Sequence, residues 1–290
     1  MEEKHVLKVA AAQIDAVAGD LDSAFAKHLD MIEQARSAGV GVLLFPELSL
    51  TGYSLGSEGL AFAMRSDDAR ILELARASGD MVTVIGLIEE GFAAQFYNSV
   101  AALRNGEVIY IHRKLNLATY GVLEEGKHFA TGRYVETFDI GGPWRIGVLI
   151  CSDLWNPALV NLVALHGATL LLAPISSAME VVGGEFDNPR GWDTCLSFYS
   201  MIYGFPVVMS NRVGMEGNLS FWGGSRIVDP FGKILSGTSG SRESLISADI
   251  DYESLRQARF HLPTVRDSNL GLVLRESERL YQVIGVPKRD

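Results

Sequence analysis

Basic residues, cysteine and long apolar runs are all scarce in this sequence. Its 290 residues include 25 Lys and Arg against 35 Asp and Glu, which gives a formal net charge of −10. Nucleic-acid binding needs clustered basic residues, so we expect no DNA or RNA partner. No uninterrupted apolar run approaches the roughly 20 residues that span a bilayer, so we expect no membrane association.

Metal-binding and secretion signals are also missing. The six histidines are scattered without the spacing of zinc ligands, so no metal site is expected. The N-terminus lacks the basic start and the small-residue cleavage site of a signal peptide, and we therefore expect a cytoplasmic protein. In a reducing compartment the only two cysteines, Cys151 and Cys195, are expected to be free thiols.

Short β-branched runs alternate with longer amphipathic stretches, which is typical of a layered α/β domain. No stretch resembles a linker, so we predict one domain over residues 1–290. Tight turns are expected at Asn105-Gly106 and at residues 229–232. The predicted strands are 6–14, 42–45, 82–87, 99–103, 108–112, 145–150, 169–173, 207–211, 225–228 and 244–250. The predicted helices are 21–37, 66–77, 157–166, 191–203 and 252–259.

Three polar residues, Glu47, Lys114 and Cys151, stand where apolar runs end. Chemistry in α/β sheets collects at the carboxyl ends of strands, and equivalent positions on neighbouring strands would bring the three together. A lysine ammonium lowers the pKa of a nearby thiol and favours the nucleophilic thiolate. A glutamate can take the thiol proton and return it to a leaving amine. These residue types therefore favour a thiol hydrolase.

Each of the three residues also has a purely structural explanation. A single cysteine is more often a small buried hydrophobe than a nucleophile. A lysine is usually a solvated surface charge, and Glu47 could simply begin a loop after Pro46. Spacing alone therefore leaves both interpretations open.

Longer segments around these residues carry a resemblance. The segments FPELSLTGY (45–53), HRKLNL with YGVLEEGKHFATG (112–132) and GVLICSDLWNP (147–157) are similar to the signature blocks of the nitrilase superfamily, the carbon-nitrogen hydrolases. VAAAQID near the N-terminus, PVVMSNRVG (206–214) and GGSRIVDPFGKIL (223–235) resemble further family segments in the same order. Several separate blocks in order are more specific than one motif.

The resemblance implies a four-layer α-β-β-α sandwich with a Glu-Lys-Cys triad. Glu47 would be the general base and acid, Lys114 would stabilise the tetrahedral intermediate and Cys151 would form a thioester. Glu125 matches a second glutamate that orients the triad, and the N–H of Ser152 matches the oxyanion donor. The resemblance also implies at least a homodimer, for which the helical faces around 159–165 and 192–203 are candidates.

Substrate-binding assignments are weaker. Tyr53, Ser152, Trp155 and Ser176 are the candidates, although Tyr53 and Trp155 could equally pack in the core. The loops at 54–58, 118–121 and 175–189 are expected to rim the pocket. Ser152 departs from the tyrosine or glutamate that follows the nucleophile in many amidases.

Neighbouring residues are expected to support the site rather than react. Asp153 should orient the chain at Cys151 or cap the helix at Asn156. Asn211 and Arg212 match a family motif that shapes the region below the site, and Cys195 is expected to be structural.

The leading hypothesis is hydrolysis of a small carboxamide or N-carbamoyl compound, releasing ammonia without a metal or organic cofactor. The segment from Lys114 to Glu125 most resembles the glutaminase domains of NAD synthetases, and since no ATP-binding domain follows Asp290 we expect a free-standing hydrolase. The alternatives are a nitrilase, an ammonia-supplying glutaminase subunit and a non-catalytic binding protein on the same scaffold. The acidic loop with Glu180, Glu185 and Asp187 could receive a cationic substrate or could simply be solvated.

Overall fold

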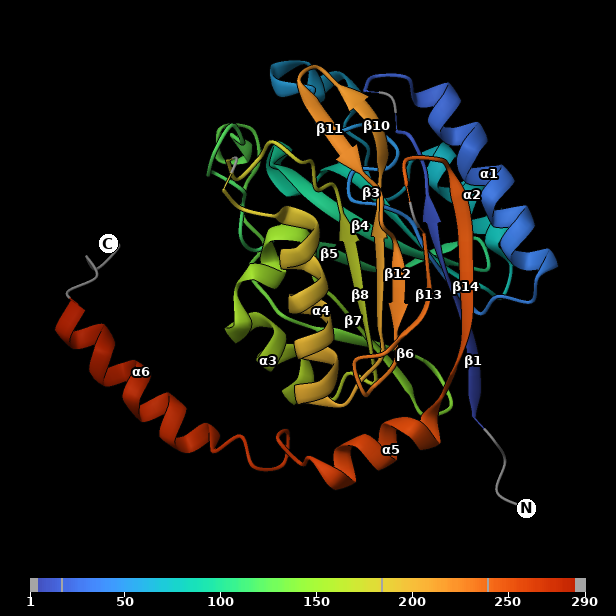
Figure 1. Cartoon of the computed structure of the whole chain (residues 1–290). Helices are drawn as coiled ribbons and strands as arrows, with labels where there is room; N and C mark the ends of the chain where they lie inside the picture. The colour runs from blue at the N-terminus through green and yellow to red at the C-terminus, as the bar shows by residue number, and fades with distance from the viewer. Residues whose placement is uncertain (1–4, 17, 184, 239, 285–290) are drawn as a thin grey trace.

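Two six-stranded sheets form the centre of the molecule (Figure 1). The computed structural model describes residues 5–16, 18–183, 185–238 and 240–284, so both ends of the predicted 1–290 domain lie outside it. The first sheet has the strand order β14-β1-β2-β3-β4-β5. Its strands are β1 Val6–Gln13, β2 Val42–Leu44, β3 Val82–Glu90, β4 Phe96–Arg104, β5 Glu107–Arg113 and β14 Ser244–Asp251. Strands β2 and β3 are parallel, whereas β4 is antiparallel to both β3 and β5, so β2 and β5 end at the same edge.

The second sheet has the order β13-β12-β9-β8-β7-β6. Its strands are β6 Thr137–Gly141, β7 Trp144–Val148, β8 Leu170–Ile175, β9 Val207–Asn211, β12 Arg226–Val228 and β13 Ile234–Gly237. Strands β7, β8 and β9 are parallel to one another. A separate hairpin consists of β10 Val213–Glu216 and β11 Leu219–Trp222.

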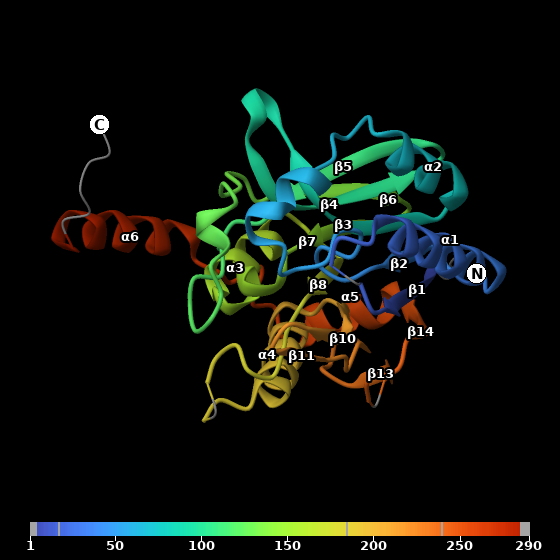
Figure 2. The same ribbon diagram turned by 90° about the horizontal axis from the view of Figure 1, so that it is seen from above.

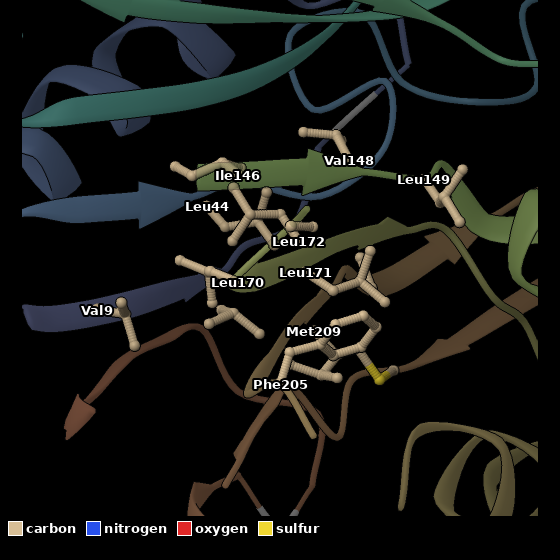
Figure 3. Close-up of a cluster of buried hydrophobic side chains, with 14 of the residues drawn as sticks. Val9, Leu44, Ile146, Val148, Leu149, Leu170, Leu171, Leu172, Phe205 and Met209 are labelled. Carbon is tan, nitrogen blue, oxygen red and sulfur yellow. The ribbon is translucent and has the colours of Figure 1, made fainter. Parts of the chain in front are cut away.

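Alternating residues of the first sheet face two different cores, because successive side chains of a strand point to opposite faces. On β1, Val9 and Ala11 pack into the core between the sheets, whereas Ala10 and Ala12 pack toward helices. Figure 3 shows Val9 and Leu44 of the first sheet beside leucines of β8 in the second sheet. Each fully buried Val, Leu or Ile side chain contributes about 1.5–3 kcal/mol.

Helices cover both outer faces of the paired sheets (Figures 1 and 2). Helices α1 and α2 pack on the first sheet, and α3 and α4 pack on the second. The helices are α1 Leu21–Ser37, α2 Ala69–Ser78, α3 Pro157–Leu165, α4 Asn188–Tyr203, α5 Tyr252–His261 and α6 Leu270–Ile284. The predicted four-layer α-β-β-α sandwich is therefore confirmed.

Most predicted elements are present with small shifts at their ends. The predictions for α1 and β9 match the observed bounds, and both turns connect paired strands. Asn105 and Gly106 have φ angles of 52° and 83°, the left-handed conformation that the Asn-Gly pair predicts. The list of predicted strands and helices lacks β6, β10, β11, β13 and α6, although the predicted turn at 229–232 leads into β13. The four strands are short and only partly buried, and α6 buries none of its residues.

Within the described part of the chain, every helix is either too short or too polar to cross a bilayer.

Candidate active site

The predicted triad comes from both sheets. Glu47 follows β2 and Lys114 follows β5, with β3 and β4 between these strands in the first sheet. Cys151 follows β7 in the second sheet. The expectation that the three residues stand on neighbouring strands was wrong, because they meet across the gap between two facing sheets.

Glu47, Lys114 and Glu125 form a buried ionic network. The Nζ atom of Lys114 donates to Oε1 of Glu47 at 2.5 Å and to Oε1 of Glu125 at 2.7 Å. All three side chains are at most 4% exposed. Charged groups without partners are costly to bury, so the Lys114 ammonium stabilises both carboxylates and they stabilise it. The second oxygen of Glu125 accepts the N–H of Ala118 at 2.9 Å, which holds the loop in place.

Both oxygens of the Glu47 carboxylate have further partners. Oε1 accepts Nδ2 of Asn98 at 2.8 Å, and Oε2 accepts the N–H of Ser176 at 2.9 Å. The hydroxyl of Ser176 donates to the backbone oxygen of Glu47 at 2.8 Å. Ser176 thus holds Glu47 from the end of β8.

Burial changes the pKa of Glu47 and that of Lys114 in opposite directions. Loss of solvation raises the pKa of Glu47, although Lys114 works in the opposite direction. Burial alone would lower the pKa of Lys114, but the nearby charges of Glu125 and Glu47 outweigh it and raise that pKa well above its usual value. Lys114 is therefore an ammonium at neutral pH.

Cys151 occupies a sharp corner between β7 and a 3-10 turn, Cys151–Trp155, that leads into α3. Its φ angle is 45°, which is uncommon for a residue with a side chain and costs of order 1–3 kcal/mol. The strained corner turns the backbone away from the strand direction immediately at the sulfur. The predicted strand 145–150 and the predicted helix 157–166 lie on the two sides of this corner.

The expected depression of the thiol pKa does not occur. Burial raises the pKa of Cys151 well above its usual value, and the charge of Glu47 adds to this effect. Lys114 lowers the pKa, as predicted, but only partly offsets burial and the two carboxylates. The free protein therefore holds a protonated thiol next to a buried carboxylate.

Asp153 links the two sheets beside the site. Its Oδ1 accepts the N–H groups of Leu115 and Asn116 at 3.0 and 2.6 Å, just after Lys114. Its Oδ2 accepts the N–H of Ile150 at 3.0 Å, just before Cys151. Since Asn156 caps α3 with its own side chain, Asp153 orients the corner and does not cap the helix.

Tyr53 is tied to the same network. Its hydroxyl donates to Oε1 of Glu125 at 2.5 Å, and its N–H contacts both carboxylate oxygens of Glu216 at 3.0 and 3.2 Å. Glu216 in turn accepts Nη1 of the fully buried Arg212 at 2.7 Å. This chain of contacts holds the loop that carries Tyr53 against Glu125.

Two residues near the site were missed by the sequence reasoning. Asn98 contacts Glu47, and its own Oδ1 finds no partner among the described residues. An asparagine directly before the apolar run of the predicted strand 99–103 was the available signal, because asparagine is depleted in strands. Tyr120 lies in the predicted rim loop, where burial raises the pKa of its hydroxyl.

A model of the carbon-nitrogen hydrolase family matches residues 8–260. The chain belongs to the carbon-nitrogen hydrolase family.

Relatives of this carbon-nitrogen hydrolase differ in length. A glutamine-dependent NAD(+) synthetase from Thermotoga maritima is 31% identical over 255 residues, covering 86% of this chain and 43% of the relative. This chain thus spans less than half of that protein. A citrullinase from Francisella tularensis is 26% identical over 272 residues, covering 90% of this chain and 94% of the relative. A solved amidase of the nitrilase superfamily from Nesterenkonia has a TM-score of 0.74 at 25% identity, covering 88% and 95% of the two chains.

The remaining predicted substrate contacts of this carbon-nitrogen hydrolase have mixed surroundings. Ser152 is buried, and its hydroxyl donates to the backbone oxygen of Asn116 at 2.5 Å. Trp155 packs against Trp192 and Phe186, with ring centroids 4.4 and 5.9 Å apart. The roles of Ser152, Trp155 and Ser176 in substrate binding stay predictions.

Two carboxylates of the acidic loop have local partners. Glu180 accepts the N–H of Ser220 at 2.8 Å, and Asp187 caps α4 by accepting the N–H of Arg190 at 3.0 Å. Selection of a cationic substrate by this loop stays a prediction. Within the described residues, no group of three or more His, Cys, Asp and Glu side chains is arranged to hold a metal ion.

Proposed function

We propose that this protein hydrolyses a non-peptide carbon-nitrogen bond in a small carboxamide or N-carbamoyl compound, through a thioester at Cys151. The observation that carries the proposal is the buried network of Glu47, Lys114 and Glu125 beside a strained, buried cysteine. A purely structural role would not require three charges next to a thiol, because burying charge is costly.

The first step is transfer of the thiol proton to Glu47 as the sulfur attacks the substrate carbonyl carbon. A protonated resting thiol makes a base necessary, and burial keeps the carboxylate basic by raising its pKa. The new sulfur-carbon bond turns the carbonyl oxygen into an oxyanion. A lysine ammonium has three N–H donors, and among the described residues Lys114 uses two on the glutamates.

The third N–H of Lys114 and the backbone N–H of Ser152 would stabilise that oxyanion. Glu47 then returns its proton to the nitrogen, the carbon-nitrogen bond breaks and ammonia leaves. Water attacks the thioester while Glu47 accepts one of its protons, and that proton returns to the sulfur as the acid is released. Glu125 holds Lys114 in place throughout because it accepts a second ammonium hydrogen.

The relatives support two substrate classes. Citrullinase and N-carbamoylputrescine amidase, each matched over 94% of its length, support an amide or carbamoyl substrate. The NAD(+) synthetases, matched over less than half of their length, support glutamine as a second candidate. In that case the protein would supply ammonia to a separate synthetase.

A substrate panel with a trapped intermediate tests the proposal. Glutamine, aliphatic amides, N-carbamoyl amines and one nitrile with its matching amide are each assayed for ammonia release. Mass spectrometry of the quenched reaction should find the acyl adduct on Cys151. Cys151→Ala should keep its circular dichroism and lose turnover, whereas Cys195→Ala should keep both.

Full activity in Cys151→Ala would contradict the mechanism. Turnover of the nitrile but not of its amide would favour the nitrilase alternative. Absence of ammonia release and of any adduct across the panel would favour the binding-protein alternative and overturn the proposal.

A further inference from the structure

The hairpin that joins β3 to β4 carries an exposed aromatic ring on a strained backbone. Phe92, at its tip, is 90% exposed. The next two residues, Ala93 and Ala94, have φ angles of 56° and 54°, and each such conformation costs of order 1–3 kcal/mol. Figure 2 shows this hairpin standing out from the first sheet. The strained tip therefore holds an apolar ring in solvent, and backbone strain of this kind is typical of ligand clamps.

A cavity of about 530 Å³ lies beside this hairpin. Its walls come from the hairpin, from the end of β5 and from the segment 131–136. The volume lies within the range of about 300–1,000 Å³ that is typical of small-molecule sites. The walls contain none of the residues Glu47, Lys114, Glu125 and Cys151, so this cavity is separate from the candidate active site.

Arg113 forms a rigid, flat surface in this cavity. Its Nε and Nη2 atoms donate to the Glu89 carboxylate at 2.8 and 2.6 Å, and that carboxylate also accepts Oγ of Ser99 at 2.7 Å. The Cζ atom of Arg113 lies 4.0 Å from the centre of the Tyr97 ring. Gly91 leaves room for this stack, since a Cβ there would lie 2.7 Å from Nη2 of Arg113 and 2.8 Å from the Tyr97 ring. The ion pair and the stack together fix the plane of the guanidinium.

Two charged groups of the cavity still have binding capacity. Arg133 is exposed, and its side chain has no partner among the described residues. Arginine binds phosphate strongly because it offers paired, charged N–H donors. Glu89 is already paired with Arg113, which leaves the exposed Glu136 as the second carboxylate of the walls. A carboxylate accepts hydrogen bonds from sugar hydroxyls, as it does in dinucleotide-binding folds.

We propose that this cavity binds a nucleoside monophosphate. The base stacks on the Arg113 guanidinium and contacts the Phe92 ring, since bases stack on arginine planes and on aromatic side chains. The phosphate accepts hydrogen bonds from Arg133, and a sugar hydroxyl donates to Glu136. A ligand that lacks either the base or the phosphate uses only part of this surface and binds more weakly.

Isothermal titration calorimetry on the full chain tests the proposal with three probes. They are AMP, adenosine, which lacks the phosphate, and ribose 5-phosphate, which lacks the base. AMP should bind at least about tenfold more tightly than either of the others, because a charge-assisted contact and a stacked base are each equivalent to about tenfold or more in Kd.

Two substitutions of exposed residues locate the binding site. Arg133→Ala should weaken AMP about tenfold and leave adenosine unchanged, because only the phosphate contact is lost. Phe92→Ala should weaken both AMP and adenosine about tenfold and leave ribose 5-phosphate unchanged, because only the contact with the base is lost. The matched controls are Arg275→Ala, an exposed arginine on α6, and Phe260→Ala, a ring on α5 that is 82% exposed. Both controls should bind all three probes as the parent does.

Each variant should keep the circular dichroism of the parent, since all four substituted side chains are exposed. The proposal is overturned if AMP binds no more tightly than adenosine or ribose 5-phosphate, or if Arg133→Ala and Phe92→Ala bind AMP as the parent does. Light scattering on the same samples covers the other use of an exposed ring. A self-association that Phe92→Ala abolishes, without AMP binding, would make the hairpin tip a protein contact and would also overturn the proposal. The titration measures nucleotide binding alone, so its outcome is separate from that of the proposed hydrolysis.

Discussion

Asp153→Asn is the substitution that tests how the two sheets are held in register at the site. Asparagine has one side-chain oxygen where aspartate has two. In the best orientation this oxygen takes the place of Oδ1 and still accepts the N–H groups of Leu115 and Asn116. The amide NH₂ then faces the N–H of Ile150, which loses its acceptor. A buried donor without a partner costs about 1–3 kcal/mol, so we expect a loss of about 2 kcal/mol in the free energy of unfolding.

The catalytic effect follows from the position of Ile150 immediately before the sulfur. Losing that anchor lets the strained corner at Cys151 relax, and a displacement of about 1 Å can cost about 100-fold in rate. We expect kcat to fall about 10- to 100-fold. KM should stay within about twofold, because Asp153 is fully buried and its partners are backbone N–H groups and Nε2 of His112 in this chain.

Steady-state kinetics on the best substrate of the panel, together with urea denaturation, measure both effects. The iodoacetamide reaction rate of Cys151 gives a third readout that needs no substrate. Asp68→Asn is the control, since Asp68 also accepts a backbone N–H but caps the distant α2. A variant that loses stability but keeps kcat within twofold would refute the positioning argument.

Three further outcomes are expected. His28 is buried with a pKa lowered to about 4 from 6.5, because burial disfavours its charged form. As the pH falls, the unfolded chain therefore binds a proton at His28 before the folded chain does. The free energy of unfolding, measured by urea denaturation, should fall by about 2 kcal/mol between pH 7 and pH 5. His28→Gln should lose that part of the pH dependence, and an equal loss in both proteins would contradict the assignment. Ultraviolet difference spectra between the parent and Cys151→Ala should show no thiolate at pH 7, and a thiolate signal there would rule out the role given to Glu47. Tyr53→Phe removes a hydrogen bond to Glu125 and should lower kcat about tenfold, the equivalent of about 1.4 kcal/mol, with KM nearly unchanged; an unaltered kcat would remove Tyr53 from the network.

Local pattern was enough to predict most of the fold. The period of apolar residues predicted α1 and β9 with their observed bounds, and the Asn105-Gly106 pair predicted a tight hairpin. These features depend on neighbouring residues alone, so the linear sequence contains them. The resemblance of three segments also identified the residues that the structure brings together, because residue types and the order of motifs can be read directly from the sequence.

The burial of individual side chains and their contacts with residues distant in the sequence could be determined only from the tertiary structure. Ser176 binds Glu47 although 129 positions separate them in the chain, and Asp153 joins the ends of two strands that lie in different sheets. The sequence predicted an ammonium that would lower the pKa of Cys151, and that interaction exists. Only the three-dimensional arrangement revealed that desolvation and two carboxylates outweigh it. Residue types alone determine which charges are available, whereas the distances between them and their removal from water decide which protonation state prevails.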